Sequence, residues 1–323
     1  MKINDIWYGN HPLGLLLAPL GSLFCIIVRI RQGLYKLGLL KRQHVTVPVI
    51  VVGNITVGGT GKTPFVIWLA QFLQQQGFKP GIVSRGYGGK TQEKCQPVHL
   101  HSDPFLVGDE PILLAKHSGC MVVVARKRFL GAQWLVNEQC NIIICDDGLQ
   151  HYALHRDIEI AIIDDIRRFG NRRCLPAGPL REPVSRLENI HFLVTKGAAL
   201  SNESSMQYHD TKMLLNVHDE NISQSLLDLR GQPVHAIAGI GHPEKFFNRL
   251  RDYGLKVRCH EFTDHYIYTQ NDIQFDDDLP VIMTEKDAVK CRTIANARHW
   301  YLPIKARLPV TFGERLLKQI KRF

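Results

Sequence analysis

Residues 47–69 read VPVIVVGNITVGGTGKTPFVIWL, and this stretch decides the fold. Residues 49–52 are all β-branched and apolar, which predicts a buried strand of a parallel sheet. A glycine-rich turn follows, and apolar periodicity from Pro64 onward predicts a helix with a proline in its first turn, where the missing N–H costs little. A strand, a glycine-rich loop, Gly-Lys-Thr and a helix in this order are typical of a phosphate-binding loop.

The loop supplies the predicted nucleotide contacts, which are Thr56, Val57, Gly58, Gly59, Thr60, Gly61, Lys62 and Thr63. Its backbone N–H groups can converge on phosphate oxygens, Lys62 can reach the β- and γ-phosphates, and the Thr63 hydroxyl can ligate Mg²⁺. One position departs from the usual G-x-x-x-x-G-K-[ST] form, because Thr56 replaces the first glycine. A glycine-rich turn without a ligand is the alternative, and the strand and helix on either side argue against it. The sequence therefore predicts binding of a nucleoside triphosphate.

The composition is that of a folded globular protein with one large or two smaller domains. The chain has 323 residues, of which 45% are hydrophobic and 22% are charged. Its eight cysteines form neither a C-x-x-C pair nor a zinc pattern, which indicates reduced thiols and no structural metal. The net charge is +10, and no acidic residue occurs between Asp5 and Glu93. This asymmetry favours an anionic partner such as nucleic acid, anionic lipid or phosphate groups.

An uncharged segment lies near the start of the chain. Residues 12–28 read PLGLLLAPLGSLFCIIV, and the basic residues Arg29, Arg31 and Lys36 follow directly. We expect a helix that lies in or dips into a bilayer, with the basic residues on anionic headgroups. Two alternatives stay open, a single membrane span with the bulk of the protein inside and a buried N-terminal core helix.

Short apolar strands alternate with helical stretches along the first two thirds of the chain. We expect strands at residues 81–84, 120–125, 141–145, 158–163 and 191–195. The pattern restarts after the polar stretch 201–211, with strands at 233–238, 255–261, 280–283 and 300–307 and a helix at 244–253. The predicted fold is α/β: a P-loop NTPase-like parallel sheet flanked by helices, a smaller second α/β domain and an N-terminal membrane-associated helix. Ligands of such sheets bind at the carboxyl ends of the strands.

The strand predicted at 141–145 ends in two adjacent carboxylates, Asp146 and Asp147. At the carboxyl end of a P-loop sheet, one such aspartate usually holds Mg²⁺ directly or through water. A surface turn before Gly148 is the alternative, and the phosphate loop earlier in the chain makes it the weaker one.

Over nearly its whole length, the chain resembles the tetraacyldisaccharide 4'-kinases (lipid A 4'-kinases) of Gram-negative bacteria. Seven motifs in order carry the resemblance: GNITVGGTGKTP at 53–64, SRGYGG at 84–89, VGDEP at 107–111, DDGLQH at 146–151, LPAGPLREP at 175–183, FTDH at 262–265 and TEKDAVK at 284–290. Two departures are small: Arg172 stands where the family usually has a glycine, and His265 is followed by Tyr266 rather than by a second histidine.

The resemblance implies phosphorylation of the 4'-hydroxyl of a tetraacylated glucosamine disaccharide 1-phosphate with MgATP, at the inner face of the cytoplasmic membrane. It also implies that Asp109 acts as the base, with His265 behind it, although an N-cap aspartate and a surface histidine would be the ordinary readings of these residues. The division then expected is a membrane-associated segment at 1–34, a P-loop kinase domain at 35–200, a smaller domain at 201–310 that closes over the active site, and a C-terminal helix at 311–323.

Donors for the substrate's phosphate and sugar groups lie in or beside these motifs, and they are Arg85, Tyr87, Arg128, Gln150, His151 and Arg181. A structural Arg181–Glu182 pair is the alternative for Arg181.

Three other classes of protein fit less well. A membrane-associated regulatory P-loop ATPase would carry a lysine before the two glycines, where this chain has Val57, and a GTPase would carry Asn-Lys-x-Asp. A basic nucleic-acid-binding module would not predict the apolar N-terminus or the aspartate pair. We expect a monomer that binds the lipid substrate and the membrane surface, and no nucleic acid.

Overall fold

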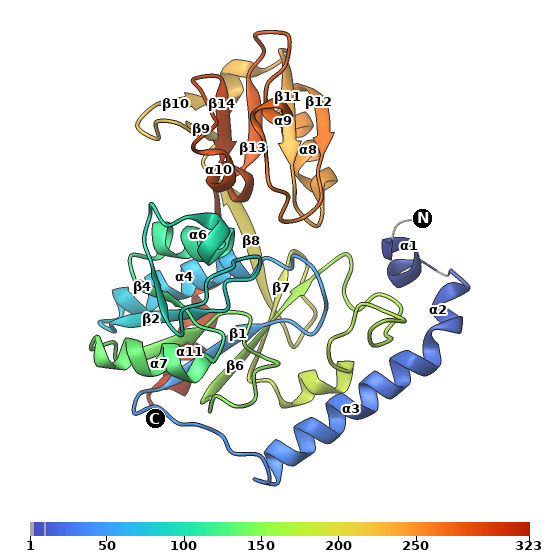
Figure 1. The fold of residues 1–323 in the computed structure, drawn as a ribbon, viewed down its shortest axis with the longest axis vertical. Helices are drawn as coiled ribbons and strands as arrows, with labels where there is room; N and C mark the ends of the chain where they lie inside the picture. Colours follow the sequence, from blue (N-terminus) through green and yellow to red (C-terminus); the bar gives the residue numbers. More distant parts are fainter. Residues whose placement is uncertain (1–2, 10) are drawn as a thin grey trace.

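The predicted phosphate-loop strand, β1 (Val49–Gly53), lies inside a nine-stranded sheet with the order β15-β8-β7-β6-β1-β5-β2-β4-β3 (Figure 1). This computed structural model describes residues 3–9 and 11–323. The other strands are β2 (Pro80–Ser84), β3 (Gln96–Val98), β4 (Met121–Val124), β5 (Ile142–Cys145), β6 (Ile158–Asp164), β7 (Phe192–Lys196), β8 (Ser204–Asp210) and β15 (Ile304–Arg307). Strands from β8 to β4 run parallel, and β15 and β3 pair antiparallel at the two edges. Since β1 and β5 are parallel neighbours, the phosphate loop and the aspartate pair leave the same edge of the sheet.

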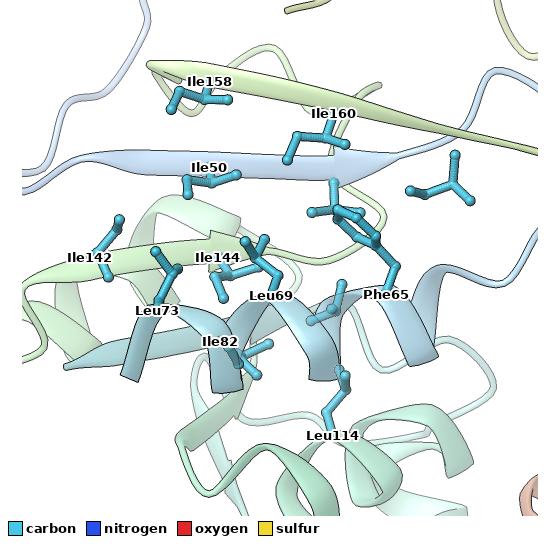
Figure 2. Close-up of a cluster of buried hydrophobic side chains, with 14 of the residues drawn as sticks. Ile50, Phe65, Leu69, Leu73, Ile82, Leu114, Ile142, Ile144, Ile158 and Ile160 are labelled. Carbon is cyan, nitrogen blue, oxygen red and sulfur yellow. The ribbon is translucent and has the colours of Figure 1, made fainter. Parts of the chain in front are cut away.

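Helix α4 (Lys62–Gln75) follows the phosphate loop and covers one face of the sheet. Its Phe65, Leu69 and Leu73 recur every fourth residue, are fully buried and point at the isoleucines of β1, β5 and β6 (Figure 2). The C-terminal helix α11 (Val310–Ile320) packs on the same face, with the Phe312 ring 6.0 Å from that of Phe65. The predicted C-terminal helix therefore packs against α4.

This unit also contains α5 (Pro104–Val107), α6 (Asp109–Ser118), α7 (Arg128–Asn137) and a 3₁₀ helix at Val184–Asn189. Ala132 and Leu135 of α7 pack with Val49 and Val51, which point to the face opposite α4. The expected parallel sheet with helices on both faces is confirmed.

The second unit is built on a six-stranded sheet with the order β10-β9-β14-β13-β11-β12. Its strands are β9 (Met213–Asn216), β10 (Ser223–Ser225), β11 (Pro233–Ala238), β12 (Lys256–Glu261), β13 (Val281–Thr284) and β14 (His299–Leu302). Its helices are α8 (Pro243–Asp252), α9 (Gln270–Ile273) and α10 (Glu285–Cys291). Helix α10 faces α6 of the first unit where the two units meet (Figure 1).

The connection between the units differs from the sequence analysis at two places. The polar stretch 201–211 contains a strand, β8, and residues 300–307 form parts of two strands instead of one. Pro303 separates β14 from β15, and the two strands belong to different sheets. Strands β8 and β15 pair antiparallel, so that a two-stranded connection joins the units.

The N-terminal segment forms three helices along one side of the large unit, α1 (Ile3–Tyr8), α2 (Leu13–Leu16) and α3 (Ala18–Lys36) (Figure 1). Gly21 of α3 is buried, and a Cβ at this position would lie only 2.8 Å from the carbonyl oxygen of Cys174. The helix therefore packs closely against the large unit at this residue. The opposite face of α3 exposes apolar side chains, namely Leu20, Leu23, Ile26, Ile27 and Ile30. No helix in the described part of the chain is long and apolar enough to cross a membrane.

Candidate active site

The phosphate loop is held by contacts that explain its glycines and its one departure from the usual form. Gly61 caps α4 with a φ of 91°, and a Cβ there would lie 2.2 Å from the hydroxyl oxygen of Tyr208 on β8. Thr56 instead forms an isolated antiparallel bridge with Leu180, and its φ is not positive. The backbone at position 56 therefore needs no glycine. The buried Thr60 hydroxyl has no hydrogen-bond partner among the described residues.

Lys62 joins the loop to the aspartate pair. Its ammonium donates to Asn54 Oδ1 at 3.2 Å and lies 3.4 Å from Asp147 Oδ1. Asn54 in turn donates to the Gly58 carbonyl oxygen at 3.4 Å. Asn54 is a site residue that sequence reasoning missed, although it stands inside the motif GNITVGGTGKTP.

The two adjacent carboxylates have opposite environments. Asp146 is buried; its Oδ2 accepts a hydrogen bond from Ser84 Oγ at 3.0 Å, while its Oδ1 has no hydrogen-bond partner in the described chain. Burial and the nearby charges of Glu110 and Asp147 raise the pKa of Asp146 to about 6. Burial also opposes ionisation of Asp147, but the charges of Lys62 and Arg181 lower its pKa to about 2. Asp147 adopts a φ of 44°, in the left-handed region that non-glycine residues rarely enter.

These residues fit a magnesium ion. The orphaned Oδ1 of Asp146 and the oxygens of Asp147 and Thr63 are hard oxygen ligands, which Mg²⁺ prefers. Residues 3–9 and 11–323 contain no group of three His, Cys, Asp or Glu side chains that would hold a metal alone. Two carboxylates and a hydroxyl suit an ion that completes its shell with waters and nucleotide phosphates.

Asp109 and His265 come together across the two units. Asp109 is the first residue of α6, and its Oδ1 accepts the N–H of Glu110 at 2.8 Å. His265 Nδ1 lies 3.2 Å from Asp109 Oδ2 in an ion-pair contact, and Oδ2 is buried with no other hydrogen-bond partner among the described residues. Burial opposes ionisation of Asp109, yet His265 and Lys286 hold its pKa below the usual range. The contact with Asp109 raises the pKa of His265, which has a φ of 60°.

The predicted substrate donors fall into two groups, of which the first surrounds the aspartate pair. Arg181 donates to both carboxylate oxygens of Asp147 at 3.0 and 2.9 Å, and Gln150 donates to the Asn54 carbonyl oxygen at 3.0 Å. Glu182 instead pairs with Arg186 at 3.3 Å. The Arg181–Glu182 pair, which was the alternative for Arg181, is not the contact observed. Burial first, and then four arginine charges, lower the pKa of His151 to about 4.

The second group is split between the surface and the interior. Arg85 and Tyr87 are exposed, and the Tyr87 ring lies 5.0 Å from that of His265. Arg128 is buried and donates to the Asp146 carbonyl oxygen at 3.2 Å, so it supports the aspartate pair from within the protein. A cavity of about 660 Å³ opens beside the Asp109–His265 contact and is lined in part by Tyr87 and Tyr268.

Comparisons with known proteins agree on one family. Residues 13–321 match the family described as LpxK, tetraacyldisaccharide-1-P 4'-kinase. The tetraacyldisaccharide 4'-kinase of Nitrosococcus oceani is 48% identical over 317 residues, which cover 98% of this chain and 93% of that protein. The enzyme of the same name from Methylobacillus flagellatus is 48% identical over 318 residues, 98% of this chain and 95% of the relative.

A solved structure has the same fold. The crystal structure of LpxK from Aquifex aeolicus in complex with ATP is similar to this chain with a TM-score of 0.80 and 30% identity. The match covers 95% of this chain and 99% of the other. By sequence motifs, site geometry and fold, the chain belongs to the tetraacyldisaccharide-1-P 4'-kinase family.

Proposed function

We propose that the chain transfers the γ-phosphate of ATP to the 4'-hydroxyl of a tetraacylated glucosamine disaccharide 1-phosphate, a step of lipid A biosynthesis. The observation that carries the proposal is the contact between Asp109 and His265, which adds a buried carboxylate to a site that already holds a phosphate loop and an aspartate pair. The relatives named above, which are named for this activity, support the choice of substrate. ATP, which is bound in the similar solved structure, and Mg²⁺, which the oxygens of Thr63, Asp146 and Asp147 fit, are the proposed cofactors.

The phosphate loop and the aspartate pair would position the nucleotide. Lys62 brings a positive charge to the loop, held in place by Asn54 and Asp147. Bound Mg²⁺, held by Thr63, Asp146 and Asp147, would supply neutralisation of the charge on the β- and γ-phosphates. Arg181 restrains the side chain of Asp147, so that the carboxylate is already oriented before the metal ion binds.

Asp109 is the proposed base for the acceptor hydroxyl. The low pKa keeps its carboxylate ionised at neutral pH, and Oδ2 has His265 as its neighbour but no other hydrogen-bond partner in the described chain. A carboxylate with a free lone pair can accept the hydroxyl proton as the phosphoryl group is transferred. His265 orients that carboxylate from the second unit. We keep the four segments 1–34, 35–200, 201–310 and 311–323 as a proposal, with the third closing over the active site. Its first and last strands, β8 and β15, pair within the large sheet and would connect the moving part to the first unit.

The exposed apolar face of α3 is the proposed membrane contact, at the cytoplasmic face of the inner membrane. Five apolar side chains of α3 are each more than half exposed, and Arg29 and Arg31 stand among them. A cavity of about 720 Å³ between α3 and residues 172–185 is lined by Arg29, Arg172 and Arg173. Apolar area together with positive charge suits the surface of an anionic bilayer. The chain would act there as a monomer, without a nucleic-acid partner.

The direct test is a transfer assay with a matched acceptor. Purified protein is incubated with γ-labelled ATP, Mg²⁺ and the disaccharide 1-phosphate, and separately with the 4'-deoxy form of the same lipid. We expect one new phosphate on the distal sugar of the first lipid and none on the second. Equal labelling of both lipids, or ATP hydrolysis without labelled lipid, would contradict the proposal; the second result would favour a regulatory ATPase.

A further inference from the structure

The motif TEKDAVK at 284–290 contributes a side chain that the proposed mechanism does not yet use. Lys286, in the first turn of α10, extends from the second unit to the start of α6. Its Nζ lies 3.1 Å from Glu110 Oε1 and 4.0 Å from Asp109 Oδ2, and 3.1 Å from Asp264 Oδ1 on its own unit. One ammonium group thus contacts three carboxylates, including the proposed base and the residue that precedes His265.

We propose that Lys286 is a positioning residue for the phosphoryl transfer, which orients the base Asp109 by joining Glu110 of the first unit to Asp264 of the second. This inference rests on the proposed function. The Lys286 side chain is only 16% exposed, while its partners Glu110 and Asp264 are 30% and 36% exposed. An ammonium so far removed from water is costly to leave without its carboxylate partners, which favours this geometry. Asp264 Oδ1 also accepts the N–H of His265 at 3.1 Å. The cation therefore holds both ends of the Asp109–His265 contact.

Lys286 and the ionisable groups around it shift one another's pKa values. Burial opposes the charge of Lys286, but Glu110, Asp109 and Asp264 raise its pKa, so it stays protonated. Its charge lowers the pKa of Asp109 and opposes protonation of His265. Loss of this charge should therefore raise the pKa of both members of the pair. Lys290, one turn later on α10, adds a weaker effect on Asp109 and pairs mainly with Asp287, at 2.9 Å.

Glu285, the residue before Lys286, offers a matched control. Glu285 also joins α10 to α6, through His117 at 2.5 Å and Lys116 at 3.6 Å. In the described part of the chain, Glu285 forms no ion pair or hydrogen bond with Asp109, His265 or Asp264. A general weakening of the interface should follow from changes at either position, whereas positioning of the base should follow only from changes at Lys286.

The experiment compares Lys286→Met, Lys286→Arg and Glu285→Gln in the full chain. We expect Lys286→Met to lower kcat roughly 10- to 100-fold with the KM for ATP changed less than about threefold, Lys286→Arg to recover much of the loss, and Glu285→Gln to stay within about threefold of the unmodified chain. If Lys286→Met fails to fold, Lys286→Met/Asp264→Asn removes the unpaired carboxylate and takes its place. Unchanged kcat, or an equal loss in Glu285→Gln, would overturn the proposal.

A second readout does not depend on the lipid substrate. The imidazole resonances of His265, assigned with His265→Gln, give its pKa in each variant by NMR titration. Lys286→Met should raise this pKa by about half a unit or more, and Glu285→Gln should leave it unchanged. If the pKa of His265 shifts in Lys286→Met but the unmodified chain does not phosphorylate the lipid, the proposed function is refuted, while the contact of Lys286 with the Asp109–His265 pair is supported. No shift in a chain that does phosphorylate the lipid would refute the role of Lys286 alone.

Discussion

The Lys62 ammonium lies 3.4 Å from Asp147 Oδ1 and links the phosphate loop after β1 to the aspartate pair after β5. Asp147 has a second cationic partner, because Arg181 contacts the same carboxylate at 2.9 Å. Removal of Lys62 therefore leaves Asp147 paired. The chain can lose this lysine without gaining an unpaired buried charge.

We accordingly expect Lys62→Ala to keep its fold and lose its turnover. The free energy of unfolding should change by less than about 1 kcal/mol, because Arg181 still pairs with Asp147. The rate of phosphoryl transfer should fall by roughly a thousandfold or more, because the cation of the phosphate loop is gone. Chemical denaturation and single-turnover kinetics measure the two quantities. Normal kinetics in the folded variant would show that Lys62 has no part in the reaction.

The two aspartates should respond differently to loss of charge. Asp146→Asn removes a buried charge that Glu110 and Asp147 repel, so the free energy of unfolding should not fall. Asp147→Asn leaves Lys62 and Arg181 without their carboxylate partner, so the free energy of unfolding should decrease. At least one variant should lose roughly a hundredfold in turnover and need more Mg²⁺. Mg²⁺ titrations of the rate, with unfolding curves as controls, test this. The same Mg²⁺ response in both variants as in the unmodified chain would exclude a metal role for the pair.

Acid should destabilise the fold through two histidines. Burial first, with nearby cations, lowers the pKa of both His151 and His242 to about 4, against about 6.5 in an unfolded chain. The unfolded state binds more protons between these values, so stability is lost as the pH falls from about 6.5 to 4. Asp146, with its pKa raised to about 6, acts in the opposite direction, so the comparison must be made between variants. His242→Gln should flatten the loss of stability between pH 7 and 5, measured by denaturant midpoints; an unchanged slope would contradict the prediction.

The exposed face of α3 should carry the membrane contact without contributing to stability. Leu23 and Ile27 are 55% and 56% exposed, so Leu23→Gln/Ile27→Gln should leave the unfolding midpoint unchanged and reduce sedimentation with anionic vesicles roughly tenfold. Ile222→Gln/Leu227→Gln is a matched control, because those side chains are 50% and 48% exposed on the second unit. Point changes are preferable to a deletion of α3, since Phe24 and Cys25 pack against the core cluster around Leu180. Full vesicle binding by the α3 variant would place the contact elsewhere.

The parts of the site that could be predicted from sequence are those in which one local motif contains both structure and chemistry. The change from the β-branched run at 49–52 to helical periodicity fixes the phosphate loop, and residues 141–147 combine a buried strand with the aspartate pair. The strand β8 was missed because SSMQYHD is polar and lacks the apolar run used to recognise the other strands. The break between β14 and β15 was missed because the apolar pattern continues across Pro303.

Contacts between distant segments were harder to predict from the sequence. The resemblance to a family implied the Asp109–His265 pair, but nothing in residues 284–290 indicates that Lys286 reaches the same carboxylate. Arg128 follows the strand at 120–125 as a surface donor would, yet its guanidinium is buried beneath Asp146. Arg172, where the family usually has glycine, has a φ of 60°, in the left-handed region that glycine adopts most easily.

The most direct test of the account is a double-mutant cycle on the Asp109–His265 pair. Asp109→Asn and His265→Asn should each lower kcat strongly, by roughly a hundredfold or more, with nearly normal ATP binding, because neither side chain belongs to the phosphate loop. If the two residues act as a unit, the double variant should be far more active than the product of the single effects predicts. Fully multiplicative losses in kcat, or ATP affinity lost together with turnover, would contradict the claim that His265 works through Asp109.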